Sequence, residues 1–286
     1  MGSSASQRQI FLWALVLSAA GIEHRVVFAQ PEWQLWVATE EESAASREIA
    51  AYEAENQNWP PKKITDEATL FLVHRPVIIP VLGALLGMYV VTGPWQDNGA
   101  WFLKGSASTS DILVHHQWWR VVTALTLHAD SVHLLGNLLI GGVLAHFLCR
   151  LLGSGFGWLL TLLAGALGNS INAILRGGGA ESVGFSTAVF GMVGILAGLR
   201  LARLTALQDV LIGIGGALSL LAFLGTEGAR TDLGAHLWGV VCGLGLGFLA
   251  ARLNLLRWVV MARAQVLAGL FSLGFVVGAW LLAFSW

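Results

Sequence analysis

Charged residues are scarce in this sequence. Only 12% of its 286 residues are charged, whereas 56% are hydrophobic. Soluble globular domains have about 25% charged residues, so this composition excludes an ordinary soluble domain for most of the chain and favours several membrane spans. The formal net charge is −1 and no basic stripe is present, which excludes nucleic acid as an expected partner.

Cysteines and metal-binding motifs are scarce as well. The two cysteines, Cys149 and Cys242, lie in apolar runs, so buried thiols are expected and a disulfide framework is not. The motif H-E-x-x-H is absent. His128 and His133 are five positions apart and would not face the same way on a regular helix. We therefore expect no metal site and no cofactor. An aspartyl mechanism would need two carboxylates within the spans, and no such pair is found there.

The first 66 residues differ from the rest of the chain, because they hold more than half of the acidic residues. Two short alternating runs, residues 24–29 and 33–38, lie between two helical stretches. This pattern predicts a small cytosolic α-β-β-α domain and linker over residues 1–66. The alternative is a signal peptide, with Arg8 as its basic start and "LSAAG" as its cleavage site.

Apolar segments separated by short polar breaks follow from residue 70 onward. Each is long enough to cross a bilayer with some tilt. The expected spans cover residues 76–93, 131–149, 156–174, 185–203, 208–224, 233–251 and 264–284. We therefore predict an all-α polytopic membrane protein with a six-helix core in residues 67–254 and an additional C-terminal transmembrane helix in residues 255–286.

The distribution of lysine and arginine predicts the orientation of these spans. Most of those near the span ends lie on the side that also holds the N-terminus, so the N-terminus is expected in the cytoplasm. The second, fourth and sixth spans then enter from the outer face. His133 and Asn137 of the second span, Ser186 of the fourth and His236 of the sixth are thereby predicted to lie at one depth.

These four residue types suit acyl transfer. A serine hydroxyl needs a base to become a nucleophile, and imidazole is the usual base near neutral pH, so Ser186 and His236 are the candidate pair. His133 and Asn137 share one helix face and are candidate donors to an oxyanion, together with the backbone N–H of Ser186. Each residue alone has a structural explanation, such as a bond to its own helix or a bridge between helices. Their predicted shared depth favours a catalytic role over these structural explanations.

Small residues around this pair predict close helix packing. Gly191 and Gly194 lie on the fourth span, and Gly239, Gly243 and Gly247 follow at small-xxx-small spacing on the sixth. Such spacing lets two backbones approach closely enough for a Ser–His contact. Phe190, one turn after Ser186, offers a ring on which the imidazole can rest.

Four short motifs resemble those of the rhomboid intramembrane serine proteases. They are "WWR" at 118–120, "HADSVHLLGN" at 128–137, "GFS" at 184–186 and "GAHLWGVVCG" at 234–243. The resemblance covers roughly residues 76–251. It implies a rhomboid-like six-helix core with a Ser186–His236 dyad that lacks a third acidic member. His133 and Asn137 would line the oxyanion hole, Gly184, Gly239 and Gly243 would support the site, and Arg120 would belong to the loop after the first span.

Two positions depart from the family pattern. Thr187 stands where the family commonly has glycine, and its branched side chain is expected to crowd the site of closest approach. Phe190 stands where tyrosine is frequent, which keeps the ring and loses a hydroxyl.

Three functions remain open at this point. The first is a protease that cleaves transmembrane segments of other membrane proteins near their outer ends. The second is an inactive rhomboid-like protein that binds membrane clients, a reading that Thr187 favours. The third is a transporter. The polar residues cluster near one face of the membrane and not at its middle, which argues against the transporter. The expected partners are transmembrane substrates and the lipid bilayer, and no sequence feature indicates an oligomeric state.

Overall fold

A computed structural model describes residues 2–4, 6–57, 76–95, 99–202, 215, 232–253, 259 and 261–286. The chain divides into two compact units, Met1–Ala68 and Thr69–Trp286. The expected span at 208–224, apart from Gly215, lies outside the described residues, and so do residues 58–66 at the end of the expected domain and linker.

The first unit is a small α+β structure. A three-stranded antiparallel sheet in the order β1-β3-β2 packs with two helices around a core that includes Ile10, Leu17 and Leu35. Its elements are β1 (Gly2–Ser4), α1 (Gln7–Ala19), β2 (His24–Ala29), β3 (Glu32–Val37), η1 (Thr39–Glu41) and α2 (Glu42–Glu55). The sequence pattern did not predict β1, because three small residues carry no alternation and form a strand only by pairing with β3.

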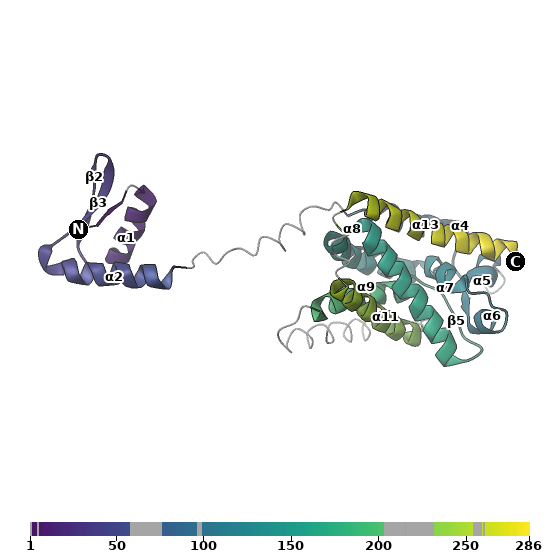
Figure 1. Ribbon diagram of the computed structural model, residues 1–286. Coiled ribbons are helices and arrows are strands. Elements are labelled where there is room, and N and C mark those ends of the chain that lie inside the picture. The colour runs from purple at the N-terminus through teal and green to yellow at the C-terminus, as the bar shows by residue number, and fades with distance from the viewer. Residues whose placement is uncertain are drawn as a thin grey trace. The chain divides into compact units, whose positions relative to one another are not determined.

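The second unit consists mainly of long apolar helices (Figure 1). Among the described residues, α8 (Ser131–Arg176), α11 (Leu233–Arg252) and α13 (Ala262–Ser285) are long and apolar enough to cross a membrane, and α4 (Ile79–Thr92) and α9 (Ser186–Leu201) are shorter apolar helices. Large apolar side chains such as Val90, Leu139 and Leu281 point outward on three of them. Such outward apolar surface suits contact with lipid chains.

Helix α8 is two helices joined at a break. Gly153 has a left-handed backbone (φ 71°), and the two halves correspond to the expected spans 131–149 and 156–174. Gln265 of α13 fills the break: its Oε1 accepts from the backbone N–H groups of Gly155 (2.8 Å) and Phe156 (3.2 Å), and its Nε2 donates to the carbonyl of Leu152 (2.8 Å). Backbone groups freed at a break need such partners in an apolar medium. The C-terminal helix is thus fastened to the core at this point.

The loop between α4 and α8 is built from short elements. These are α5 (Ala100–Gly105), β4 (Ala107–Ser108), α6 (Thr109–Leu113), α7 (Arg120–Thr123) and η2 (Ala124–Thr126). Strand β4 pairs with β5 (Glu181–Ser182), which lies just before α9. Arg120 is buried here, donates to the carbonyls of Leu103 (2.6 Å) and Ser106 (3.0 Å), and forms an ion pair with Asp111 (3.1 Å). The loop is therefore tied to the segment that leads to Ser186.

Helices α9 and α11 touch along their backbones. A methyl group on Gly243 would clash with the backbone oxygen of Gly191, and one on Gly194 would clash with that of Val240. Side chains larger than hydrogen at these positions would separate the two helices. The glycines therefore set the distance between the starts of α9 and α11, where Ser186 and His236 lie.

Candidate active site

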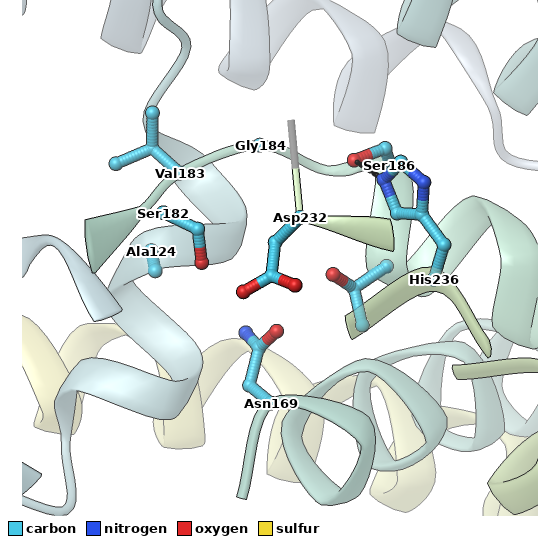
Figure 2. Close-up of a pocket in the computed structure, with 9 residues that line it drawn as sticks. Ala124, Asn169, Ser182, Val183, Gly184, Ser186, Asp232 and His236 are labelled. Atoms are coloured by element: carbon cyan, nitrogen blue, oxygen red, sulfur yellow. Dashed lines mark hydrogen bonds between the residues drawn. The ribbon is translucent and has the colours of Figure 1, made fainter. Parts of the chain in front are cut away.

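Ser186 and His236 form a direct hydrogen bond in the structure. Ser186 is the first residue of α9, and His236 lies in the first turn of α11. Oγ of Ser186 is 2.7 Å from Nε2 of His236, within the reach that proton transfer to a base requires (Figure 2). Nδ1 of His236 has no hydrogen-bond partner among the described residues. The imidazole is therefore paired with serine through one nitrogen only.

Phe190 holds the imidazole from the other side. Its ring centroid lies 4.4 Å from that of His236, and the two planes are inclined by 25°. Phe190 is fully buried one turn after Ser186, so the same helix presents both the hydroxyl and the ring. Stacking of this kind restricts rotation of the imidazole and keeps Nε2 directed at Oγ.

Thr187 fits into space left by two glycines. Its Cγ2 would lie 3.0 Å from a methyl group on Gly168 of α8 and 3.3 Å from one on Gly239 of α11. Thr187 is buried, and the Ser186–His236 hydrogen bond next to it is short. The crowding expected from a branched residue after Ser186 is therefore relieved by the absence of side chains at 168 and 239.

His133 lies beside the serine hydroxyl. Gly184 has a left-handed backbone (φ 138°), and a methyl group on it would lie 2.6 Å from Cε1 of His133 and 3.3 Å from Oγ of Ser186. The His133 ring and the Ser186 hydroxyl thus lie on either side of the position that a side chain at residue 184 would occupy. A glycine at 184 keeps this position free. Asn137 is buried one turn further along α8, and its Nδ2 donates to the His133 carbonyl at 3.0 Å.

His128 also faces His133, which the sequence reasoning did not predict. The two ring centroids are 5.6 Å apart in an edge-to-face arrangement. The helix-spacing argument was wrong here because α8 begins at Ser131, with Asp130 as its N-cap, so His128 precedes the helix. Neither ring nitrogen of His128 has a hydrogen-bond partner of acceptable geometry among the described residues.

Burial of His128 favours its neutral form. Burial, and after it the neighbouring His133, lower the pKa of the imidazole to about 3, and Asp130 and the Thr126 backbone offset only part of this shift. His128 is therefore uncharged at neutral pH.

A small polar cavity adjoins the dyad (Figure 2). Besides Ser186, His236, Thr187 and Gly184, its lining residues are Ala124, Asn169, Ser182, Val183 and Asp232. The sequence reasoning did not name Asp232 as a site residue. Asp232 is the N-cap of α11, and it is also buried and lines this cavity. The signal in the sequence is a carboxylate four positions before His236, at the start of the same helix.

The structure brings five of the predicted site residues together and places the other four around them. Ser186, His236, His133, Phe190 and Gly184 come together at the starts of α9, α11 and α8. Gly239 and Gly243 lie at the α9–α11 contact, and Asn137 lies one turn from His133. Arg120 is engaged in the loop between α4 and α8, where it contacts Leu103, Ser106 and Asp111.

Comparison with known proteins points to one family. Residues 115–253 match the family described as "Rhomboid domain". The chain is 31% identical to "Putative rhomboid protease YdcA" of Bacillus subtilis over 164 residues, which are 55% of this chain and 76% of that protein. It is 27% identical to "Rhomboid-like protease 3" of Toxoplasma gondii over 188 residues, 63% of this chain and 68% of that protein.

A third relative is matched over a smaller share of its own length. "Rhomboid protease GluP" of Bacillus subtilis is 26% identical over 193 residues, 66% of this chain and 37% of that protein. The matches, the apolar helices and the predicted motifs agree, and the family predicted from the sequence is confirmed. The chain is a mostly helical, multi-pass membrane protein of the rhomboid family.

Proposed function

We propose that this protein is an intramembrane serine endopeptidase that cleaves transmembrane segments of other membrane proteins. The observation that carries the proposal is the 2.7 Å contact between Oγ of Ser186 and Nε2 of His236. The names of the relatives, which describe them as rhomboid proteases, support the reaction class.

Ser186 acts as nucleophile and His236 as general base and acid. As Oγ attacks the substrate carbonyl, its proton passes to Nε2, and a tetrahedral intermediate forms. His236 then gives this proton to the leaving amine, and an acyl-enzyme remains on Ser186. Water attacks the ester with His236 again as base, which releases the carboxylic acid and restores the hydroxyl.

His133, Asn137 and the backbone N–H of Ser186 stabilise the oxyanion. His133 lies beside Oγ, where the carbonyl oxygen must arrive. The Asn137 amide carries two N–H groups, and one of them is bonded to the carbonyl of His133. The other can donate to the oxyanion. A single donor of this kind contributes on the order of 10²–10³ in rate.

The lysine and arginine distribution supports a cytoplasmic N-terminus in the cell membrane and a site that opens to the outer face. A substrate helix must unwind to expose its carbonyl, since a helical backbone bonds its own carbonyls. Substrates are therefore transmembrane segments with helix-weakening residues near their outer ends.

The sequence leaves open a second candidate, a client-binding protein without activity, because Thr187 follows the nucleophile. The two candidates differ in cleavage. The full chain is reconstituted in liposomes with a single-span protein that carries Gly and Pro near one end of its span, and products are identified by mass spectrometry. Cuts within that end by the wild type, lost in Ser186→Ala, support the protease. Binding of the span by the wild type without any cut supports the client binder.

A further inference from the structure

The cluster of Asp232, Asn172 and Arg176 next to the dyad has no part in the mechanism above. We propose that Asp232 is a positioning residue for His236, that its charge stabilises the imidazolium formed during catalysis, and that Arg176 tunes this effect. The inference rests on the proposed Ser186–His236 chemistry and adds an acidic partner that acts without a direct bond to the imidazole.

Asp232 is held by three partners from two helices. Its Oδ1 accepts from the backbone N–H of Ala235 at 3.2 Å, which caps α11. Its Oδ2 accepts from Nδ2 of Asn172 at 2.7 Å and pairs with Nη1 of Arg176 at 2.7 Å, both from the end of α8. The carboxylate is buried, so these charge-assisted bonds hold it in one orientation.

This anchorage sets the rotation of the first turn of α11. The backbone N–H of His236 donates to the Asp232 carbonyl at 3.1 Å, so His236 lies one turn after the anchored residue. Gly234, between them, packs against Asn172 so closely that a methyl group there would clash with Oδ1 of the amide. A movement of Asp232 would therefore carry His236 away from Ser186.

The charge of Asp232 also acts on the imidazole. Among the residues that the structure describes, the titratable groups that face His236 are His133 from α8 and Asp232 from the start of α11, while α9 contributes the Ser186 hydroxyl and the Phe190 ring. Nδ1 of His236 has no hydrogen-bond partner among the described residues. Within the described part of the chain, the positive charge that His236 gains therefore faces the Asp232 carboxylate, across the cavity that both residues line (Figure 2). Coulomb attraction in such a weakly screened place stabilises the imidazolium.

Arg176 opposes this effect. Its guanidinium pairs with the same carboxylate, and its side chain is 52% exposed. Loss of the arginine charge leaves the Asp232 charge less compensated, whereas loss of the Asp232 charge removes the attraction. The two changes should therefore move the charge state of the base in opposite directions.

The test is the pH dependence of active-site labelling by a fluorophosphonate probe, measured as a second-order rate constant on the full chain in detergent. Asp232→Asn keeps a good N-cap and removes the charge. We expect its maximal rate to fall roughly tenfold and its acid limb to move down by about one pH unit, because a base without a nearby anion loses its proton at lower pH. Arg176→Gln should move the acid limb up. Arg200→Gln, at the exposed end of α9, is the matched control and should give the wild-type profile.

The outcomes separate this inference from the proposed function. Opposite shifts in Asp232→Asn and Arg176→Gln support it. Rates that fall in both variants with the wild-type pH profile would show a structural contact only and overturn it, although the dyad would stand. Should Asp232→Asn fail to fold, Arg176→Gln alone decides, because its half-exposed side chain can be replaced without a buried cavity. A folded wild type that does not react with the probe overturns the proposed function itself.

Discussion

Thr187 of α9 and Gly239 of α11 occupy one shared space. A methyl group on Gly239 would clash with the backbone oxygen of Thr187 and would lie 3.3 Å from its Cγ2. The branched residue that follows the nucleophile is therefore compatible with a short Ser186–His236 hydrogen bond only while position 239 has no side chain.

Gly239→Ala tests this relationship. The added methyl group should push α11 away from α9 and lengthen the distance from Oγ of Ser186 to Nε2 of His236. A displacement of about 1 Å can cost on the order of 10² in rate, and overpacking costs about 1–3 kcal/mol in stability. Cleavage rate and thermal unfolding are the measurements. Gly245→Ala is the control, because a methyl group there meets no atom within 4 Å. Equal rates in the two variants would show that the α9–α11 contact does not set the dyad geometry.

Asn137→Ala should fold and insert but cleave slowly. The substitution removes a hydrogen-bond donor to the transition state and leaves the nucleophile and the base in place. The cleavage rate should therefore fall by at most on the order of 10²–10³-fold. The neighbouring His133 can reduce the loss. Turnover numbers and melting temperatures measured on the same preparation separate a catalytic defect from a folding defect. Full turnover in Asn137→Ala would remove this side chain from the oxyanion hole.

Gln265→Leu should destabilise the membrane unit. The backbone N–H groups of Gly155 and Phe156 would lose their partner at the break in α8, at a cost of about 1–3 kcal/mol for each group left unsatisfied. Unfolding in detergent by heat or denaturant measures the effect. Leu267→Ala on the same helix is the control, because Leu267 is exposed. If Gln265→Leu unfolds like the wild type, water or another group must fill the break.

His128 should contribute to acid sensitivity. The pKa of the His128 imidazole is about 3 in the folded protein, whereas that of an unburied histidine is 6.5. Between these two values the unfolded chain takes up a proton that the folded chain does not. Stability is therefore lost as pH falls from 6.5 toward 3, by up to about 1.4 kcal/mol per pH unit. In His128→Leu, the free energy of unfolding should fall less steeply over this range. Parallel pH curves for the two proteins would show that His128 is protonated, or solvated, in the folded state.

Part of the site follows from the sequence by elementary arguments. Hydropathy places Ser186 and His236 near the starts of two spans, and the lysine and arginine bias makes these spans parallel, so the two residues are expected at one depth. Glycine spacing adds that the two helices can approach. These arguments need only the position of a residue along its own span.

Other features depend on contacts between spans, which hydropathy does not encode. The space that receives Thr187 is opened by Gly168, a residue of α8 that no spacing rule connects to position 187. From the sequence alone, Asp232 is an ordinary helix cap. Its contacts with Asn172 and Arg176 are evident only in the structure. Gln265 is a polar residue near the start of an apolar segment, and its function is evident only at the break beside Gly153.

Covalent labelling of Ser186 by a fluorophosphonate probe tests the central claim most directly. An activated serine attacks phosphorus, whereas a serine that only packs does not. We predict that the wild-type protein in detergent or liposomes is labelled on Ser186, that Ser186→Ala is not labelled, and that His236→Ala is labelled far more slowly. A folded wild-type protein that stays unlabelled, or a Ser186→Ala variant that is labelled as fast as the wild type, would contradict the Ser186–His236 dyad.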